Sequence, residues 1–143
     1  MRGLFYILIL TLFFSCKKAE DVTTIPNIDF QEITPSMVQE YIDDINITIS
    51  YNDSDGDLGE NNSDIYNLFV LDNRNGIEYK FRIPQLSPNS SEISITGKFN
   101  IKINGTGITN ESTTQQVDYT IYVVDRAGNF SNSITTPSIT IYK

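Results

Sequence analysis

The sequence contains no histidine and no tryptophan, and it has a single cysteine among its 143 residues. Without histidine, the chain cannot carry Ser-His-Asp or Cys-His nucleophilic chemistry, an imidazole acid or base, or a histidine-ligated zinc ion. One cysteine can form neither an internal disulfide nor a cysteine-rich metal centre. The net charge of −8 argues against nucleic acid as a partner, because phosphates require a basic surface. The length allows one ordinary domain with a leader or a tail.

Helix-forming residues are also scarce. Alanine occurs twice, and only four leucines follow the first 15 residues, whereas isoleucine and threonine are abundant. Apolar and polar residues alternate in several short segments, which is typical of half-buried β-strands. The expected strands are 25–33, 45–51, 65–71, 77–83, 99–103, 117–123 and 134–142. We expect one helical turn at Thr34–Met37, tight turns at Asp72–Gly76 and Asp125–Asn129, and a long polar loop over 104–116.

The first residues have the composition of a secretory signal. Arg2 precedes 13 residues without a charge, and a membrane-spanning helix needs about 20. We therefore expect residues 1–15 to be a signal peptide. Residues 16–24 would then be a modified cysteine and a flexible tether, followed by one folded domain over 25–143.

The end of this segment resembles a bacterial lipobox, in which the cysteine is acylated and becomes the mature N-terminus. Ser15 precedes Cys16, and the Phe-Phe-Ser-Cys sequence followed by Lys17-Lys18 and acidic residues is similar to lipoproteins of the Bacteroidota. The resemblance implies a covalent lipid such as palmitate on Cys16, and a location in the outer membrane or at the cell surface. Several acyl chains would anchor the protein stably. The alternative is an incidental thiol beside an ordinary signal peptidase site.

About seven short strands in some 115 residues predict an all-β fold, a Greek-key β-sandwich. The segment 119–131 is similar to the penultimate strand and turn of bacterial Ig-like and fibronectin type III-like domains. In that resemblance Tyr119 would form a tyrosine corner. Three further segments, 52–59, 81–88 and 125–132 together with 135–139, resemble a family of Bacteroidota lipoproteins. That family implies a fold and a location, but no activity.

The negative charge is concentrated in residues 40–64, which hold eight acids and no basic residue. Outside this stretch the ten remaining acids balance the ten basic residues. Four of the eight acids follow the 1, 3, 5 and 12 spacing of an EF-hand loop and are candidate ligands for Ca²⁺: Asp53, Asp55, Asp57 and Asp64. Leu58 replaces the expected glycine, and no helices are expected on either side. The alternative is a solvated Asp/Gly-rich turn between two strands.

These features favour a non-catalytic protein. A pair of carboxylates could hydrolyse glycosides, but acids crowded in one polar loop lack the apolar pocket that raises the pKa of an acid catalyst. We therefore expect no catalytic residues, and a role in adhesion or in binding an envelope protein or an extracellular polymer. One alternative is a glycan-capture module beside an outer-membrane transporter, in which Tyr66, Tyr122 or Tyr142 could stack on sugars. Another is a structural subunit that binds only Ca²⁺.

Overall fold

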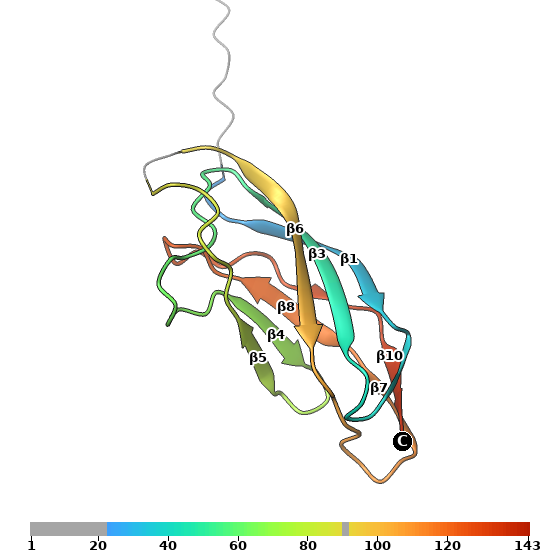
Figure 1. Cartoon of the computed structure of the whole chain (residues 1–143). Coiled ribbons are helices and arrows are strands. Elements are labelled where there is room, and N and C mark those ends of the chain that lie inside the picture. Colours follow the sequence, from blue (N-terminus) through green and yellow to red (C-terminus); the bar gives the residue numbers. More distant parts are fainter. Residues whose placement is uncertain (1–22, 90–91) are drawn as a thin grey trace, which may run out of the picture.

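The computed structural model describes residues 23–89 and 92–143. The expected signal peptide and Cys16 lie outside these residues. Within them the fold is all-β, with ten strands in three sheets and no helix (Figure 1). No helix there is long and apolar enough to cross a membrane. The strands are β1 (Asn27–Thr34), β2 (Met37–Gln39), β3 (Ile45–Asp53), β4 (Leu68–Asp72), β5 (Glu78–Phe81), β6 (Ile95–Ile103), β7 (Thr114–Val117), β8 (Tyr119–Val123), β9 (Ile134–Thr135) and β10 (Ile139–Tyr142).

The strands form sheets in the orders β1-β3-β6, β5-β4-β8-β9 and β2-β10-β7. Neighbouring strands are antiparallel, except that β2 and β10 run parallel. The longest ladder pairs nine residues of β3 with nine of β6. It runs from the pair of Ile45 with Ile103 to the pair of Asp53 with Ile95. Figure 1 shows that β1, β3 and β6 lie on one side of the molecule, facing β4, β5 and β8.

All three sheets contribute to one hydrophobic core. In β3, the alternate residues Ile45, Ile47 and Ile49 are fully buried, and the residues between them face outward. Burial of one such side chain stabilises the fold by about 1.5–3 kcal/mol. The period-2 alternation therefore sets which face of each strand points inward, as the sequence predicts.

Several expected strands are divided or shortened. The segment 117–123 is interrupted at Asp118, so that β7 pairs with β10 whereas β8 pairs with β4 and β9. The segment 134–142 is interrupted in the same way, and β9 and β10 belong to different sheets. Residues 34–37 do not form the expected helical turn, because β1 ends at Thr34 and β2 begins at Met37, with a cis Thr34–Pro35 peptide bond between them.

The strand expected from Ile65 begins only at Leu68, and just before it the side chain of Asn67 bonds to the backbone of Ile83. Asn67 is 4 % exposed, and its amide donates to the carbonyl of Ile83 (3.1 Å) while its Oδ1 accepts from the Ile83 N–H (2.6 Å). Ile65 and Tyr66 are left exposed. As expected, the two tight turns connect antiparallel partners, β4 with β5 at 72–76 and β8 with β9 at 125–129.

The molecule is elongated and has loops at both ends (Figure 1). We call the end that holds Thr24, the loop 54–60 and Arg126 the N-terminal pole. The other end, which holds the loops 40–44, 73–77 and 104–113, is called the distal pole.

Candidate metal site

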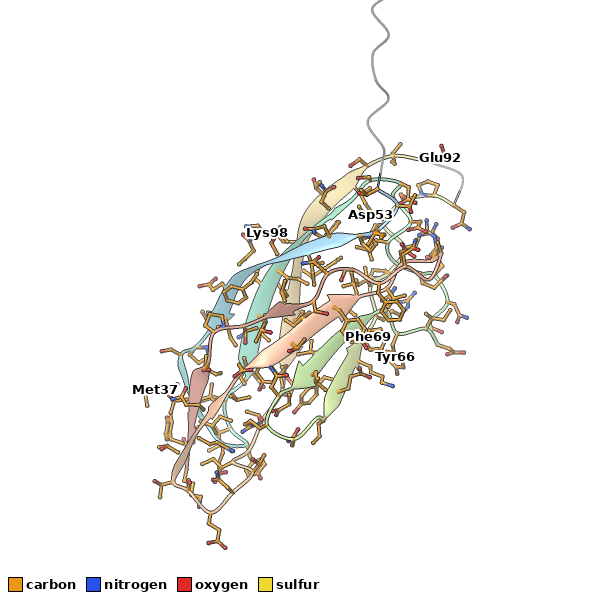
Figure 2. All side chains as sticks on the ribbon, turned by 180° about the vertical axis from the view of Figure 1, so that it is seen from behind. Met37, Asp53, Tyr66, Phe69, Glu92 and Lys98 are labelled. Carbon is orange, nitrogen blue, oxygen red and sulfur yellow. The ribbon has the colours of Figure 1, made fainter. Side chains whose placement is uncertain are left out.

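The acidic triad, which consists of Asp53, Asp55 and Asp57, lies at the N-terminal pole (Figure 2). Asp53 is the last residue of β3 and is fully buried, and the other two are half-buried in the loop that follows. One ligand atom from each of the three residues lies within 4.8 Å of the others. The structure therefore gathers three of the four acids that the EF-hand-like spacing singles out, into a group that could hold a metal ion.

The loop turns back on itself because one of its residues belongs to the core. Leu58 is fully buried, and its backbone N–H donates to Oδ2 of Asp53 (2.7 Å). Gly56 and Gly59 have positive φ angles of 75° and 89°, which glycine adopts without steric cost. At both positions a Cβ would collide with a backbone carbonyl, that of Ile93 or that of Pro84. The glycines thus let the loop pack tightly against the segment that precedes β6.

A second loop holds the triad from the other side. The backbone N–H of Arg126 donates to the carbonyl of Asp57 (3.2 Å), and the N–H of Ala127 donates to the Asp57 carboxylate (3.1 Å). The Arg126 guanidinium also donates to the carbonyl of Gly59 (2.8 Å). The sequence of residues 125–129 predicts only a turn, and nothing in this local pattern shows that the turn would contact residues about 70 positions away.

Each member of the triad has one oxygen without a partner. The Oδ1 atoms of Asp53, Asp55 and Asp57 are buried and accept no hydrogen bond within the described residues. An unpartnered buried polar atom is unfavourable, and a charged one is more so. The three carboxylates also approach one another closely, and a cation between them would compensate this burial most directly.

The pKa values of two members of the triad agree with a site for a cation. Burial raises the pKa of Asp53 to about 6, with a smaller increase from the neighbouring Asp55, against the effect of the Leu58 N–H bond. Burial also raises the pKa of Asp57, and Asp125 and Asp55 raise it further. The folded chain therefore resists ionisation of these two carboxyls in the absence of a positive charge.

The chemistry of the donors suits a hard divalent ion. Carboxylate oxygens are the ligands that Ca²⁺ prefers, and Ca²⁺ accepts six to eight oxygens in a flexible geometry. A cavity of about 370 Å³ adjoins Asp55 and Asp57 and offers further oxygens, from Ser54, Asn89 and Glu92. Three carboxylates together with these groups or water molecules could complete the coordination shell.

The fourth expected ligand lies apart from this group. Asp64 is exposed, and the cluster of possible ligands does not include it. Its backbone N–H donates to Oδ1 of Asn62 (3.0 Å), and its Oδ1 accepts from Ser63. The chain between Leu58 and Asp64 is held by Arg82, whose guanidinium donates to the carbonyls of residues 60–62. It therefore does not wrap around one ion as an EF-hand loop does.

Of the tyrosines that could stack on sugars, Tyr122 already packs against other aromatic rings, whereas Tyr66 does not. Tyr122 stacks on Phe69 with ring centroids 4.9 Å apart, so one face of the Tyr122 ring is covered by Phe69. Tyr66 is 54 % exposed but belongs to no described aromatic pair. Tyr119 is fully buried, and its hydroxyl donates to no backbone group in the described structure, so the expected tyrosine corner does not form.

Comparisons with protein-family models, with curated proteins and with solved structures find no match for this chain. The chain is an all-β protein with several small antiparallel sheets. The comparisons identify no family and no homologue.

Proposed function

We propose that this chain is a lipid-anchored protein of the bacterial cell envelope that carries one non-catalytic binding module, stabilised by Ca²⁺. The module would be an Ig-like β-sandwich over residues 25–143. The lipid would be attached to Cys16, and the partner would be another envelope protein or an extracellular polymer.

The strand order supports the Ig-like part of the proposal. One three-stranded sheet, β1-β3-β6, faces a sheet of order β5-β4-β8-β9, and strands close in sequence are distributed between the two. The chain passes from β1 in one sheet to β2 in the sheet β2-β10-β7, and from β9 in another sheet to β10 in that same third sheet. Strands that switch from one sheet to another occur at the corners of packed β-sheets.

The acidic triad carries the calcium part of the proposal. Its three buried, unpartnered Oδ1 atoms are the single observation that a solvated Asp/Gly turn does not explain. Bound Ca²⁺ would neutralise the repulsion between these carboxylates and hold the loop 54–60 against the 125–129 turn. An extracellular site with few protein ligands would bind Ca²⁺ with a Kd of roughly 10⁻⁴–10⁻³ M.

The same geometry supports a role without catalysis. The Asp53 carboxylate accepts from Leu58 and has its second oxygen buried within the triad, so neither oxygen is placed to meet a substrate. The acids converge on one point instead of flanking a cleft, as the two carboxyls of a glycosidase do.

Thermal unfolding of the full-length chain with and without Ca²⁺ tests the proposal. An ion that binds only the folded state stabilises it, by about 1.4–2.7 kcal/mol at about 10 mM Ca²⁺ for the Kd range above. We expect the melting temperature to rise by roughly 4–10 °C in the wild type. Asp55→Asn should abolish the rise, because it removes a ligand and its charge.

Asp64→Asn provides the matched control. It removes the same charge from the same acidic stretch, but at an exposed residue outside the triad. This variant should keep the full response to Ca²⁺. A wild-type melting temperature that is equal in chelator and in millimolar Ca²⁺ would show that the triad holds no calcium.

A further inference from the structure

The distal pole carries an exposed tyrosine in an unfavourable backbone conformation. Tyr41 has φ = 60° and is, within the described residues, the single non-glycine residue with a positive φ. It is 71 % exposed, so its side chain is not required to fill the core. Asparagine or glycine would occupy this position at lower steric cost. Backbone strain at an exposed aromatic residue suggests a binding role.

The surrounding loop fixes the position of this ring. The Tyr41 N–H donates to the carbonyl of Thr106 (3.0 Å), which ties the loop 40–44 to the loop 104–113. The end of the phenol ring occupies the space that a Cβ on Gly107 would fill. The ring is therefore held by backbone on one side and is open to solvent on the other.

Tyr41 forms one wall of a pocket of about 200 Å³ at this pole. Tyr79 and the half-exposed Ile77 also line the pocket, and Asp72 and Arg74 contribute to its floor. The pocket is smaller than the 300–1,000 Å³ typical of sites for drug-sized ligands, and it would take one ring of a larger molecule.

A buried ion pair makes the floor rigid and electrically balanced. Arg74 Nη2 lies 2.6 Å from Asp72 Oδ2, and both side chains are nearly inaccessible to solvent. The guanidinium also donates to Thr106 Oγ1 (3.0 Å), to the Gly107 carbonyl (3.0 Å) and to Gln115 (3.1 Å). Because the carboxylate and the guanidinium are matched to each other, the floor offers no free charge to an ionic ligand.

The remaining polar groups of the pocket are free to bind a neutral ligand. The hydroxyls of Tyr41 and Tyr79 and the side-chain nitrogen of Asn75 have no hydrogen-bond partner among the described residues. A pocket with two phenol rings and a few uncharged donors suits a ligand with apolar C–H faces and a rim of hydroxyls.

We infer that the distal pole binds a single neutral pyranose unit of a glycan, which packs between Tyr41 and Tyr79. This inference rests on the proposed binding role and specifies its ligand class, but it is independent of the calcium site, which lies at the other pole. Most of the residues that line the pocket belong to the loops of the distal pole.

The test is a titration of the isotope-labelled full-length chain, in micelles, with methyl β-glucoside, methyl β-galactoside, methyl α-mannoside and N-acetylglucosamine. We expect at least one sugar to shift the amide resonances of residues 41, 79 and 105–107 at millimolar concentration. Tyr41→Asn should weaken this binding by at least about tenfold, because it removes the stacking ring. The melting temperature of this variant should not fall, since asparagine tolerates the left-handed conformation.

Two further variants separate binding from folding. Gly107→Ala should displace the ring of Tyr41 and weaken sugar binding, while Gly107 itself does not have the positive φ that would strain alanine. Tyr66→Asn removes an exposed tyrosine that does not line the pocket, and it should bind the sugar as the wild type does.

Three outcomes would overturn the inference. They are no shift with any of the four sugars, shifts that survive Tyr41→Asn unchanged, and self-association of the wild type that Tyr41→Asn abolishes. The last would identify the pole as an interface between copies. Sugar binding that persists in chelator and in a Cys16→Ser variant would support the pocket even if the calcium or anchor proposals failed.

Discussion

At the scale of single residues, Asp53 shows how one side chain can serve both the fold and a site. Its Oδ2 accepts from Leu58 and orders the turn, whereas its Oδ1 is buried without a partner. Other acids of the stretch 40–64 have separate structural roles. Asp44 pairs with Lys102 (2.6 Å), and Asp43 accepts from the backbone N–H of Gln39 (2.7 Å). The concentration of charge therefore does not by itself mark the site; the burial of Asp53 does.

The raised pKa of Asp53 predicts the pH dependence of stability in calcium-free buffer. Its ordinary pKa of 3.8 applies to the unfolded chain, and burial raises the pKa to about 6 in the folded protein. Between these pH values the folded state binds a proton that the unfolded state releases. Ionised Asp53 therefore lowers the free energy of unfolding above about pH 6, and this loss is relieved as the pH falls towards 4.

Asp53→Asn removes this titration while its side-chain oxygen can still accept from Leu58. We expect the variant to gain stability relative to the wild type as the pH rises from about 4 to about 7, measured by chemical denaturation in calcium-free buffer. With Ca²⁺ present the sign reverses at neutral pH, because the ion stabilises the ionised triad. A stability difference that stays constant across this pH range would contradict the assignment.

At the scale of elements, the alternation of apolar residues predicts the strands but not where they change sheets. Residues 45–51 alternate strictly and lie in one long strand, β3. The segments 117–123 and 134–142 alternate as well, yet each is divided between two sheets. A period-2 pattern specifies an inward face, and it does not specify which neighbour supplies the hydrogen bonds.

The sequence likewise predicts part of the candidate site, namely which acids lie in one loop, but not the path of that loop. The spacing of Asp53, Asp55 and Asp57 within one loop is visible in the sequence, and the structure brings these residues together. Asp64 fits the same spacing, but the path of the loop depends on contacts from Arg82 and Arg126, which are distant in sequence. The sequence does not indicate a role for Tyr41, because the residue type does not predict a left-handed backbone conformation at a tyrosine.

The contact between Asn67 and the backbone of Ile83 makes a further prediction at this scale. Asn67→Leu would remove the bond to the buried N–H of Ile83, while the Ile83 carbonyl would still accept from the N–H of Glu60 (3.0 Å). We expect a loss of about 1–3 kcal/mol in the free energy of unfolding, measured by urea denaturation. Asn52→Leu, at an exposed position of β3, is the control and should change stability by less than about 0.5 kcal/mol. Equal losses in the two variants would contradict a role for the side-chain pairing.

At the scale of the whole molecule, the two poles have different characters. The N-terminal pole holds the acidic triad, and Asn129 fixes the first described residues there by donating to the carbonyl of Thr24 (3.1 Å). The distal pole holds the neutral pocket with Tyr41. The proposed tether would enter at the N-terminal pole and would leave the distal pole free for the proposed partner.

The proposed anchor is tested by fractionation of the producing cells. Wild-type protein should sediment with the membranes, and Cys16→Ser should be recovered in the soluble fraction, because acyl chains provide the membrane affinity. Unchanged melting temperature of the variant serves as the control for folding. A Cys16→Ser protein that still sediments with membranes would contradict lipid attachment at this residue.

The antiparallel pairing of β1 with β3 has a mechanical consequence. Strand β1 starts at the N-terminal pole and runs towards the distal pole. Its ladder with β3 extends from the pair of Asn27 with Asn52 to the pair of Thr34 with Asn46. A force that pulls on the N-terminus while the distal pole is held would act along these strands and not across them. The hydrogen bonds of the ladder would then share the load and have to break together, whereas a force across the strands would open them one after another.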